Sequence, residues 1–130
     1  MTYNLFISHS WTYHDEYARL IGLLRANPYF HFKDYSVPKN DPILHSDSDA
    51  ALRLAIREQM RPTSCVLILA GVYSTYSKWI NIEINLAKSM GKKIIAIEPY
   101  GAERTSSIVK DKADVIVCWN TQSIINAIRD

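Results

Sequence analysis

The sequence predicts an α/β fold in which one five-stranded parallel sheet lies between two layers of helices, as a three-layer sandwich. Short apolar runs alternate along the chain with segments of helical periodicity, the pattern of repeated β–α units. Two runs, 64–71 and 92–99, are apolar at most positions, as in central strands buried on both faces. The length of 130 residues suits a single domain over 1–130, with the flavodoxin-like strand order 2-1-3-4-5.

The first half of the chain contains two predicted strands, one helix and a long loop. A short apolar run predicts a strand at 3–8, and apolar residues repeat at helical spacing over 14–27. Residues 29–35 alternate as in a strand. Two prolines and many turn-forming residues predict a loop at 36–48, and loops of this length often carry function.

The second half continues the alternation of helix and strand. One predicted helix ends just before Pro62, and another ends at Gly91, a residue that favours helix termination. The segment 100–113 is irregular or briefly helical. The remaining elements are, in order, a helix at 49–60, a strand at 64–71, a helix at 77–90, strands at 92–99 and 114–119, and a helix at 121–130.

Charge and composition exclude several classes of partner. The net charge of +2, with no run of basic residues, argues against nucleic-acid or membrane-surface partners. The first residues do not resemble a signal peptide, and no apolar stretch is long enough to cross a bilayer. Cys65 and Cys118 each lie in a strand-like apolar run, which predicts buried free thiols. No cluster of cysteine and histidine suggests a metal site, and we expect a reduced, cytoplasmic protein.

Glu83 is the most unusual residue of the predicted helix at 77–90. At about 100° per residue, a polar stripe forms on one side of that helix, made of Lys78, Asn81, Asn85, Lys88 and, beyond its end, Lys92. Glu83 falls on the opposite side, among uncharged neighbours. A carboxylate in a pocket stabilises positive charge, as the breaking of a glycosidic bond requires. Alternatively, Glu83 pairs with a basic residue of a neighbouring helix or reaches the surface at the edge of the domain.

The fold predicts where a site lies, because ligands of parallel sheets bind beyond the carboxyl ends of the strands, near the reversal of strand order. The end of the first strand carries Ser8, His9, Ser10 and Trp11. These residues either supply hydroxyl and backbone N–H groups to a ligand or form a simple turn. Five aromatic residues near this edge either stack on a ligand ring or pack its rim: Trp11, Tyr35, Tyr73, Tyr76 and Trp79.

Other chemistry known on such folds is not supported by the residues. The chain has no G-x-S-x-G elbow for a nucleophilic serine, and no glycine-rich phosphate loop. The strand ends lack the acidic residues with which phospho-receiver domains hold a metal ion. We therefore expect neither a bound metal nor a bound dinucleotide cofactor of the Rossmann type.

Three motifs together resemble a known family, the TIR domains. "FISHS" (6–10) resembles the first TIR signature, and "SKWINIE" (77–83) resembles the TIR segment Ser-x-Trp-x-x-x-Glu. "DYSVPKNDPI" (34–43) resembles the loop after the second strand in the bacterial and archaeal TIR-like subfamily that includes the TIR proteins of Thoeris anti-phage systems. The likeness runs in order over nearly the whole chain.

The resemblance implies an enzyme that consumes NAD. Glu83 matches the glutamate with which catalytic TIR domains cleave the bond between nicotinamide and ribose. The product is ADP-ribose or a cyclic ADP-ribose isomer, and in Thoeris systems it signals to a separate effector protein. NAD is then the substrate, with no other cofactor, and some self-association is expected. The residues implied to bind substrate are Ser8, His9, Ser10, Trp11 and Trp79 around the pocket, and Tyr35, Ser36 and Lys39 in the covering loop.

One position departs from the family pattern, because Ile80 stands where TIR domains usually have a cysteine after the tryptophan. Two alternative functions remain open. The first is a TIR-like interaction module that assembles partners without catalysis. The second is a nucleoside glycosidase or deoxyribosyltransferase-like enzyme, which uses a similar fold and a glutamate on a ribosyl bond.

Overall fold

The structure is a computed structural model that describes residues 1–8, 14–36, 49–69, 78–98 and 107–130. Within these residues it forms a five-stranded sheet of order β2-β1-β3-β4-β5, in which every neighbouring pair of strands is parallel. The predicted α/β fold and strand order are confirmed. The strands are β1 (Thr2–Ser8), β2 (His31–Asp34), β3 (Cys65–Leu69), β4 (Lys93–Ile97) and β5 (Val115–Val117). The helices are α1 (His14–Arg25), α2 (Asp49–Met60), α3 (Lys78–Ser89), α4 (Ser107–Lys112) and α5 (Thr121–Arg129).

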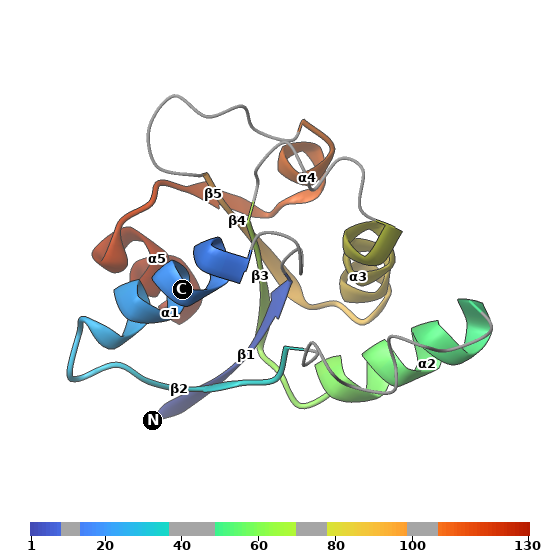
Figure 1. Ribbon diagram of the computed structural model, residues 1–130, viewed down its shortest axis with the longest axis horizontal. Helices are drawn as coiled ribbons and strands as arrows, with labels where there is room; N and C mark the ends of the chain where they lie inside the picture. Colours follow the sequence, from blue (N-terminus) through green and yellow to red (C-terminus); the bar gives the residue numbers. More distant parts are fainter. Residues whose placement is uncertain (9–13, 37–48, 70–77, 99–106) are drawn as a thin grey trace.

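The helices cover both faces of the sheet (Figure 1). Helices α1 and α5 lie on one face and pack Leu20, Leu24 and Ile125 against the strands. Helices α2, α3 and α4 lie on the other face, where Ile56 and Ile80 join the opposite cluster of buried side chains. Two apolar layers of this kind, one on each side of a parallel sheet, supply most of the stabilisation through burial of apolar surface.

Burial along α3 follows the predicted polar stripe. Asn81, Asn85 and Lys88 are exposed, whereas Ile80 and Ala87 are buried against the sheet. None of the described helices is both long enough and apolar enough to span a membrane. The solvent-exposed side of α3 was correctly predicted, and its opposite side is part of the core that surrounds Glu83.

Some of the predicted element ends differ from those in the structure. Strand β5 covers only Val115–Val117, so Cys118 lies beyond it and is exposed, whereas Cys65 is buried as predicted. The prediction of a buried Cys118 was wrong because β5 is a short edge strand that ends at Val117, one residue before it. The segment 100–113, expected to be irregular or briefly helical, contains the short helix α4.

Helix α5 provides a test of this local structure. Its cap residue Asn120 has an extended backbone, and Asn120 Oδ1 accepts a hydrogen bond of 3.0 Å from the Ser123 N–H. Replacing such a cap by alanine costs about 1 kcal/mol. We expect Asn120→Ala to lower the free energy of unfolding by that amount in urea denaturation. Gln122→Ala, which removes only a side-chain bond to Asn126 on the exposed side, is the control, and equal midpoints for the two variants would contradict the assignment.

Candidate functional site

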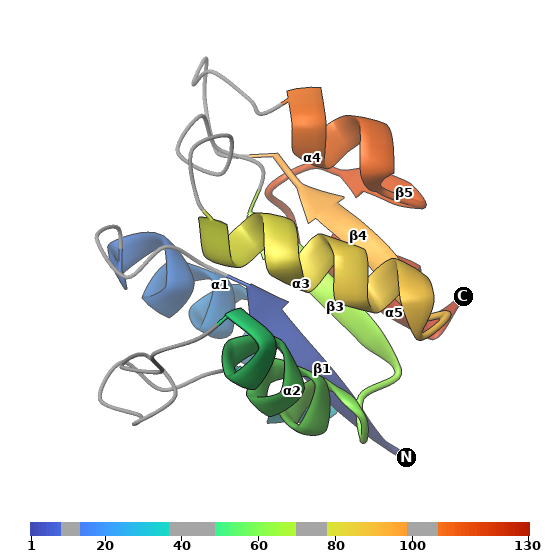
Figure 2. The ribbon, with the colours of Figure 1, turned by 90° about the vertical axis from the view of Figure 1, so that its right-hand side faces the viewer.

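Ser8 stands at the carboxyl end of β1 and faces α3. Side chains alternate along a strand, and Phe6, two residues earlier, packs in the same cluster as Ile80 and Ala87 of α3. Ser8 is paired with Ile68 of β3 in the sheet register and is only 1% exposed. Figure 2 shows α3 lying across β3 and β4, beside the end of β1. The register thus brings the Ser8 hydroxyl under the helix that carries Glu83.

Glu83 is buried in the apolar layer between α3 and the sheet. It is 5% exposed, and its neighbours on the helix, Ile82 and Ile84, are buried as well. Burial favours the neutral acid and raises the pKa of Glu83 from its ordinary value of 4.5 to about 8, while the nearby Ser8 hydroxyl lowers it in part. The carboxyl group is therefore mostly protonated at neutral pH until something stabilises its charge.

The Glu83 carboxyl group also has unused hydrogen-bonding capacity. Among the described residues, neither Glu83 Oε2 nor Ser8 Oγ has a partner at normal hydrogen-bond geometry, although both atoms are buried. The described part of the chain also offers Glu83 no lysine or arginine as an ion pair; its ion pairs join other residues. Buried polar groups without partners are rare in folded proteins. This pair is available to a ligand with hydroxyl groups or positive charge.

Most of the other predicted site residues cannot be placed. His9, Ser10, Trp11 and Lys39 lie outside the described residues, as do Tyr73 and Tyr76. Trp79 belongs to α3, but its side chain is also outside the described part. Of the predicted set, the structure brings together Ser8 and Glu83, and the roles of the others stay predictions.

Tyr35 and Ser36 follow directly after β2, at the same edge of the sheet as Ser8. The Tyr35 N–H donates to the Leu5 carbonyl at 2.8 Å, which continues the pairing of β2 with β1. The Ser36 N–H donates to Asp34 Oδ1 at 2.8 Å, and the Tyr17 hydroxyl donates to Asp34 Oδ2. These bonds fix the start of the segment that follows β2.

Sequence patterns alone did not identify Tyr17 and Asp34 as partners of the segment that follows β2. The signal was present in part, because aspartate two residues before serine is typical of a turn in which the side chain accepts a backbone N–H. Tyr17 was assigned only to the apolar face of its helix, since nothing in the sequence shows that its hydroxyl reaches β2. The two residues act here on the local backbone, and no contact joins them to Glu83 in the described structure.

A groove of about 580 Å³ lies between α1 and β2, away from Glu83. Its lining mixes apolar and aromatic side chains with Arg25, His31 and Asp34, and the Asp34 carboxyl group already accepts hydrogen bonds from Tyr17 and Ser36. The described residues contain no group of three or more His, Cys, Asp or Glu side chains that could hold a metal ion. Of the described acids, Glu83 is therefore the one whose setting suits chemistry on a ligand.

Comparison with solved structures supports the fold. A conserved protein from Enterococcus faecalis V583 aligns with a TM-score of 0.66 and 11% identity, over 99% of this chain and 98% of that one. The CMP N-glycosidase BcmB of Clostridium botulinum aligns with a TM-score of 0.55 and 18% identity, over 97% of each chain. At these identities the likeness concerns the fold. No curated protein matches the chain in sequence.

The family follows from the sequence. The family model described as Thoeris protein ThsB, TIR-like domain, matches residues 6–104, most of the chain. The matched range begins within β1, includes Ser8, and contains the whole of α3 with Glu83. The chain therefore belongs to the family of TIR-like domains of the Thoeris protein ThsB.

Proposed function

We propose that this protein cleaves the bond between nicotinamide and ribose of NAD, with Glu83 as the catalytic carboxylate. The observation that carries the proposal is the buried Glu83 carboxyl group, which has a free oxygen beside Ser8 and no described ion-pair partner. Membership of a TIR-like family of Thoeris systems supports it. NAD is the substrate, and the proposal requires no further cofactor.

The chemistry suits a single buried carboxylate. Cleavage of an N-glycosidic bond passes through a transition state with positive charge on the ribose, and a carboxylate in a site of low dielectric stabilises that charge more strongly than in water. The nicotinamide ring of NAD carries a positive charge and leaves as a neutral molecule. The leaving group therefore needs no proton, and one carboxylate is sufficient for the electrostatic part of the reaction.

We propose the remaining roles by the same resemblance. Ser8, His9, Ser10, Trp11 and Trp79 surround the ribose and the rings, and Tyr35, Ser36 and Lys39 cover them. The product, ADP-ribose or a cyclic isomer of it, is a signal to a separate effector protein in anti-phage defence. Self-association of the chain completes the active form.

Cleavage of a nucleotide such as CMP is the second candidate. It is favoured by the likeness in fold to the CMP N-glycosidase BcmB, since that protein also breaks a bond between a ring nitrogen and a sugar. The two candidates differ in the leaving group. Cytosine leaves readily only when it is protonated, so this reaction needs an acid that the NAD reaction does not need.

Parallel assays with NAD and with CMP distinguish the candidates. We expect the purified protein to release nicotinamide from NAD and no cytosine from CMP, with products separated by chromatography. Cytosine release without nicotinamide release would favour the second candidate. Release of neither base, at high protein concentration and with extract of infected cells added, would indicate a TIR-like interaction module without catalysis.

The pH dependence of the reaction follows from the state of Glu83. The carboxylate is the active form, and the pKa of Glu83 in the free protein is raised to about 8. We therefore expect kcat/KM for NAD to rise roughly tenfold per pH unit at lower pH and to level off above that pKa. Initial rates measured between about pH 6 and about pH 9.5 give the profile, because this interval extends to both sides of the pKa. A rate that is flat across the interval would contradict a protonated Glu83 in the free protein.

A further inference from the structure

Ser8 Oγ and Glu83 Oε2 are the buried side-chain oxygens of the described residues that have no hydrogen-bond partner at normal geometry, and they lie in the same layer between α3 and the sheet. Burial raises the pKa of Glu83, and the nearby Ser8 hydroxyl lowers it, so the two influences oppose each other. Ser8 Oγ has no hydrogen-bond partner at normal geometry among the described residues, so its single proton is free to turn toward the carboxyl group when that group is charged. A hydroxyl that donates to a carboxylate stabilises the charged form relative to the neutral acid.

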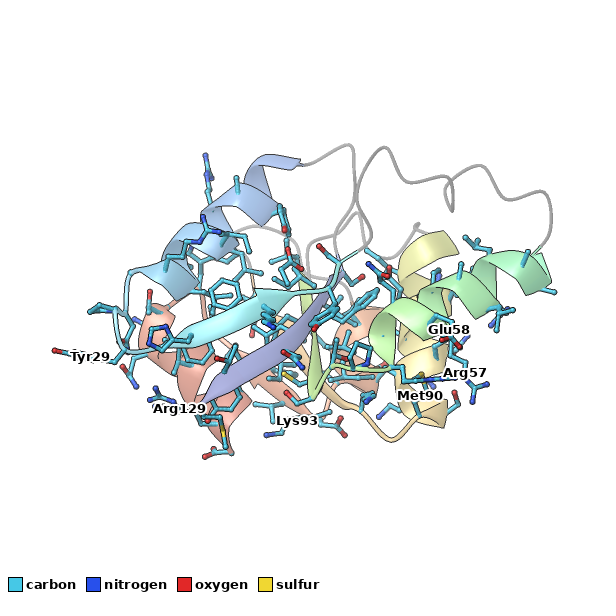
Figure 3. All side chains as sticks on the ribbon, turned by 90° about the horizontal axis from the view of Figure 1, so that it is seen from below. Tyr29, Arg57, Glu58, Met90, Lys93 and Arg129 are labelled. Carbon is cyan, nitrogen blue, oxygen red and sulfur yellow. The ribbon has the colours of Figure 1, made fainter. Side chains whose placement is uncertain are left out.

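The described charged and titratable side chains of the surrounding elements do not lower the pKa of Glu83 in place of Ser8. On α2, Arg53, Arg57 and Glu58 are exposed, and Figure 3 shows the last two together on that helix. On β4, Lys93 Nζ donates to the backbone carbonyls of Ala127 and Asp130 on the other face of the sheet.

The titratable group of β3, the Cys65 thiol, packs in the cluster of that other face, and burial raises its pKa to about 11. On α4, Lys110 pairs with Glu98, and Asp111 and Lys112 are exposed. On α3 itself, Lys88 is exposed and pairs with Asp114. None of these groups contributes to the pKa of Glu83, so within the described structure its charge is governed by burial and by Ser8.

We propose that Ser8 is a positioning residue whose hydroxyl donates to the Glu83 carboxylate, favours its charged form and orients it toward the bound ribosyl group. This inference rests on the proposed function, because it assigns to Ser8 the control of the same carboxylate. Ser8 then acts through Glu83, and its position at the carboxyl end of β1 is what aims the hydroxyl at the helix. Burial raises the pH at which the site works, and this hydroxyl lowers it again in part.

Removal of the hydroxyl tests the proposal. A hydrogen bond to a charged group is worth enough to move a pKa by about 1, so we expect the pKa of Glu83 to rise by that amount in Ser8→Ala. The pKa is read from the pH titration of ¹³C-labelled glutamate carboxyl signals, and the Glu83 signal is assigned by its loss in Glu83→Gln. The chain has only five glutamates, so the signals are few. Ser8→Thr keeps the hydroxyl and should titrate like the wild type.

Thr63→Val is the matched control. Thr63 is also a buried hydroxyl, 2% exposed, but its Oγ1 donates to the Met60 carbonyl at 2.6 Å, at the end of α2. This variant removes a buried hydroxyl from the same protein and should leave the pKa of Glu83 unchanged. Ser8→Cys, with a weaker donor, should give an intermediate pKa and provides a second folded variant at the site itself.

The enzymatic readout is separate from the titration. In Ser8→Ala, kcat/KM for NAD should fall about tenfold at pH 7 and recover at high pH, where Glu83 is charged without help. An unchanged pKa of Glu83 in both Ser8→Ala and Ser8→Cys would overturn the proposal. A pKa that rises in Ser8→Ala, in a protein that releases no nicotinamide, would support the coupling of Ser8 to Glu83 and contradict the proposed function.

Discussion

Glu83→Gln is expected to reduce nicotinamide release from NAD by at least about 10³-fold, a loss of about 4 kcal/mol of transition-state stabilisation. Glutamine has nearly the volume of glutamate, so the packing around this buried position is preserved, but it cannot carry a negative charge. The lost interaction acts on charge that develops only in the transition state, so kcat should fall more than KM rises. Initial rates at pH 9, where wild-type Glu83 is mostly charged, give the largest contrast.

Glu58→Gln is the control for this result. Glu58 lies on α2, 53% exposed, and pairs with Arg61 at 2.9 Å on the surface. The same chemical change at this position should leave the rate of NAD cleavage unchanged. Equal rates for Glu83→Gln and the wild type would show that Glu83 has no part in the reaction and would contradict the proposed mechanism.

The second large expected effect concerns the free energy of unfolding, which depends on pH through the charge of Glu83. The pKa of Glu83 is about 8 in the folded protein and 4.5 ordinarily, so between these values the unfolded chain binds fewer protons than the folded one. The free energy of unfolding of the wild type therefore falls as pH rises through this window and is unaffected below it. At about 1.4 kcal/mol per pKa unit, the full cost above pH 8 is about 4–5 kcal/mol.

Glu83→Gln removes this dependence because its side chain does not titrate. We expect the stability of Glu83→Gln relative to the wild type to increase by about 4 kcal/mol between pH 5 and pH 9, measured by urea denaturation at each pH. The other titrating groups are common to both proteins and cancel in the difference. In Glu58→Gln the difference should stay constant. A constant difference for Glu83→Gln as well would mean that the folded protein leaves the pKa of Glu83 near its ordinary value.

The sequence predicted the fold well because hydrophobic patterning determines which segments are buried. The continuous apolar runs became β3 and β4, and the polar stripe of α3 marked its exposed side through Asn81, Asn85 and Lys88. Glu83 was identified by the same periodicity, as a carboxyl group on the buried side. Element ends were predicted less well: an edge strand as short as β5 depends on its single neighbour, which local sequence does not reveal.

The partners of Glu83 could not be predicted from local patterns. That Ser8 acts on Glu83 depends on the register of β1 against β3 and on the packing of α3 across the sheet, which are properties of the whole fold. The bonds of Asp34 with Tyr17 and Ser36 likewise join two elements that are distant in the sequence. Whether a buried acid has an ion-pair partner is a question of the same kind, and for Glu83 the described structure offers none.

The most direct test is a chromatographic time course of NAD with the concentrated wild-type protein at pH 9, with Glu83→Gln and Glu58→Gln alongside. The proposed function predicts nicotinamide together with ADP-ribose or a cyclic isomer from the wild type and Glu58→Gln, and neither product from Glu83→Gln. Intact NAD in the wild-type reaction, even after addition of extract from phage-infected cells as a trigger, would contradict it and favour an interaction module. Equal cleavage by Glu83→Gln would contradict it as well, because the buried carboxylate would then have no part in the reaction.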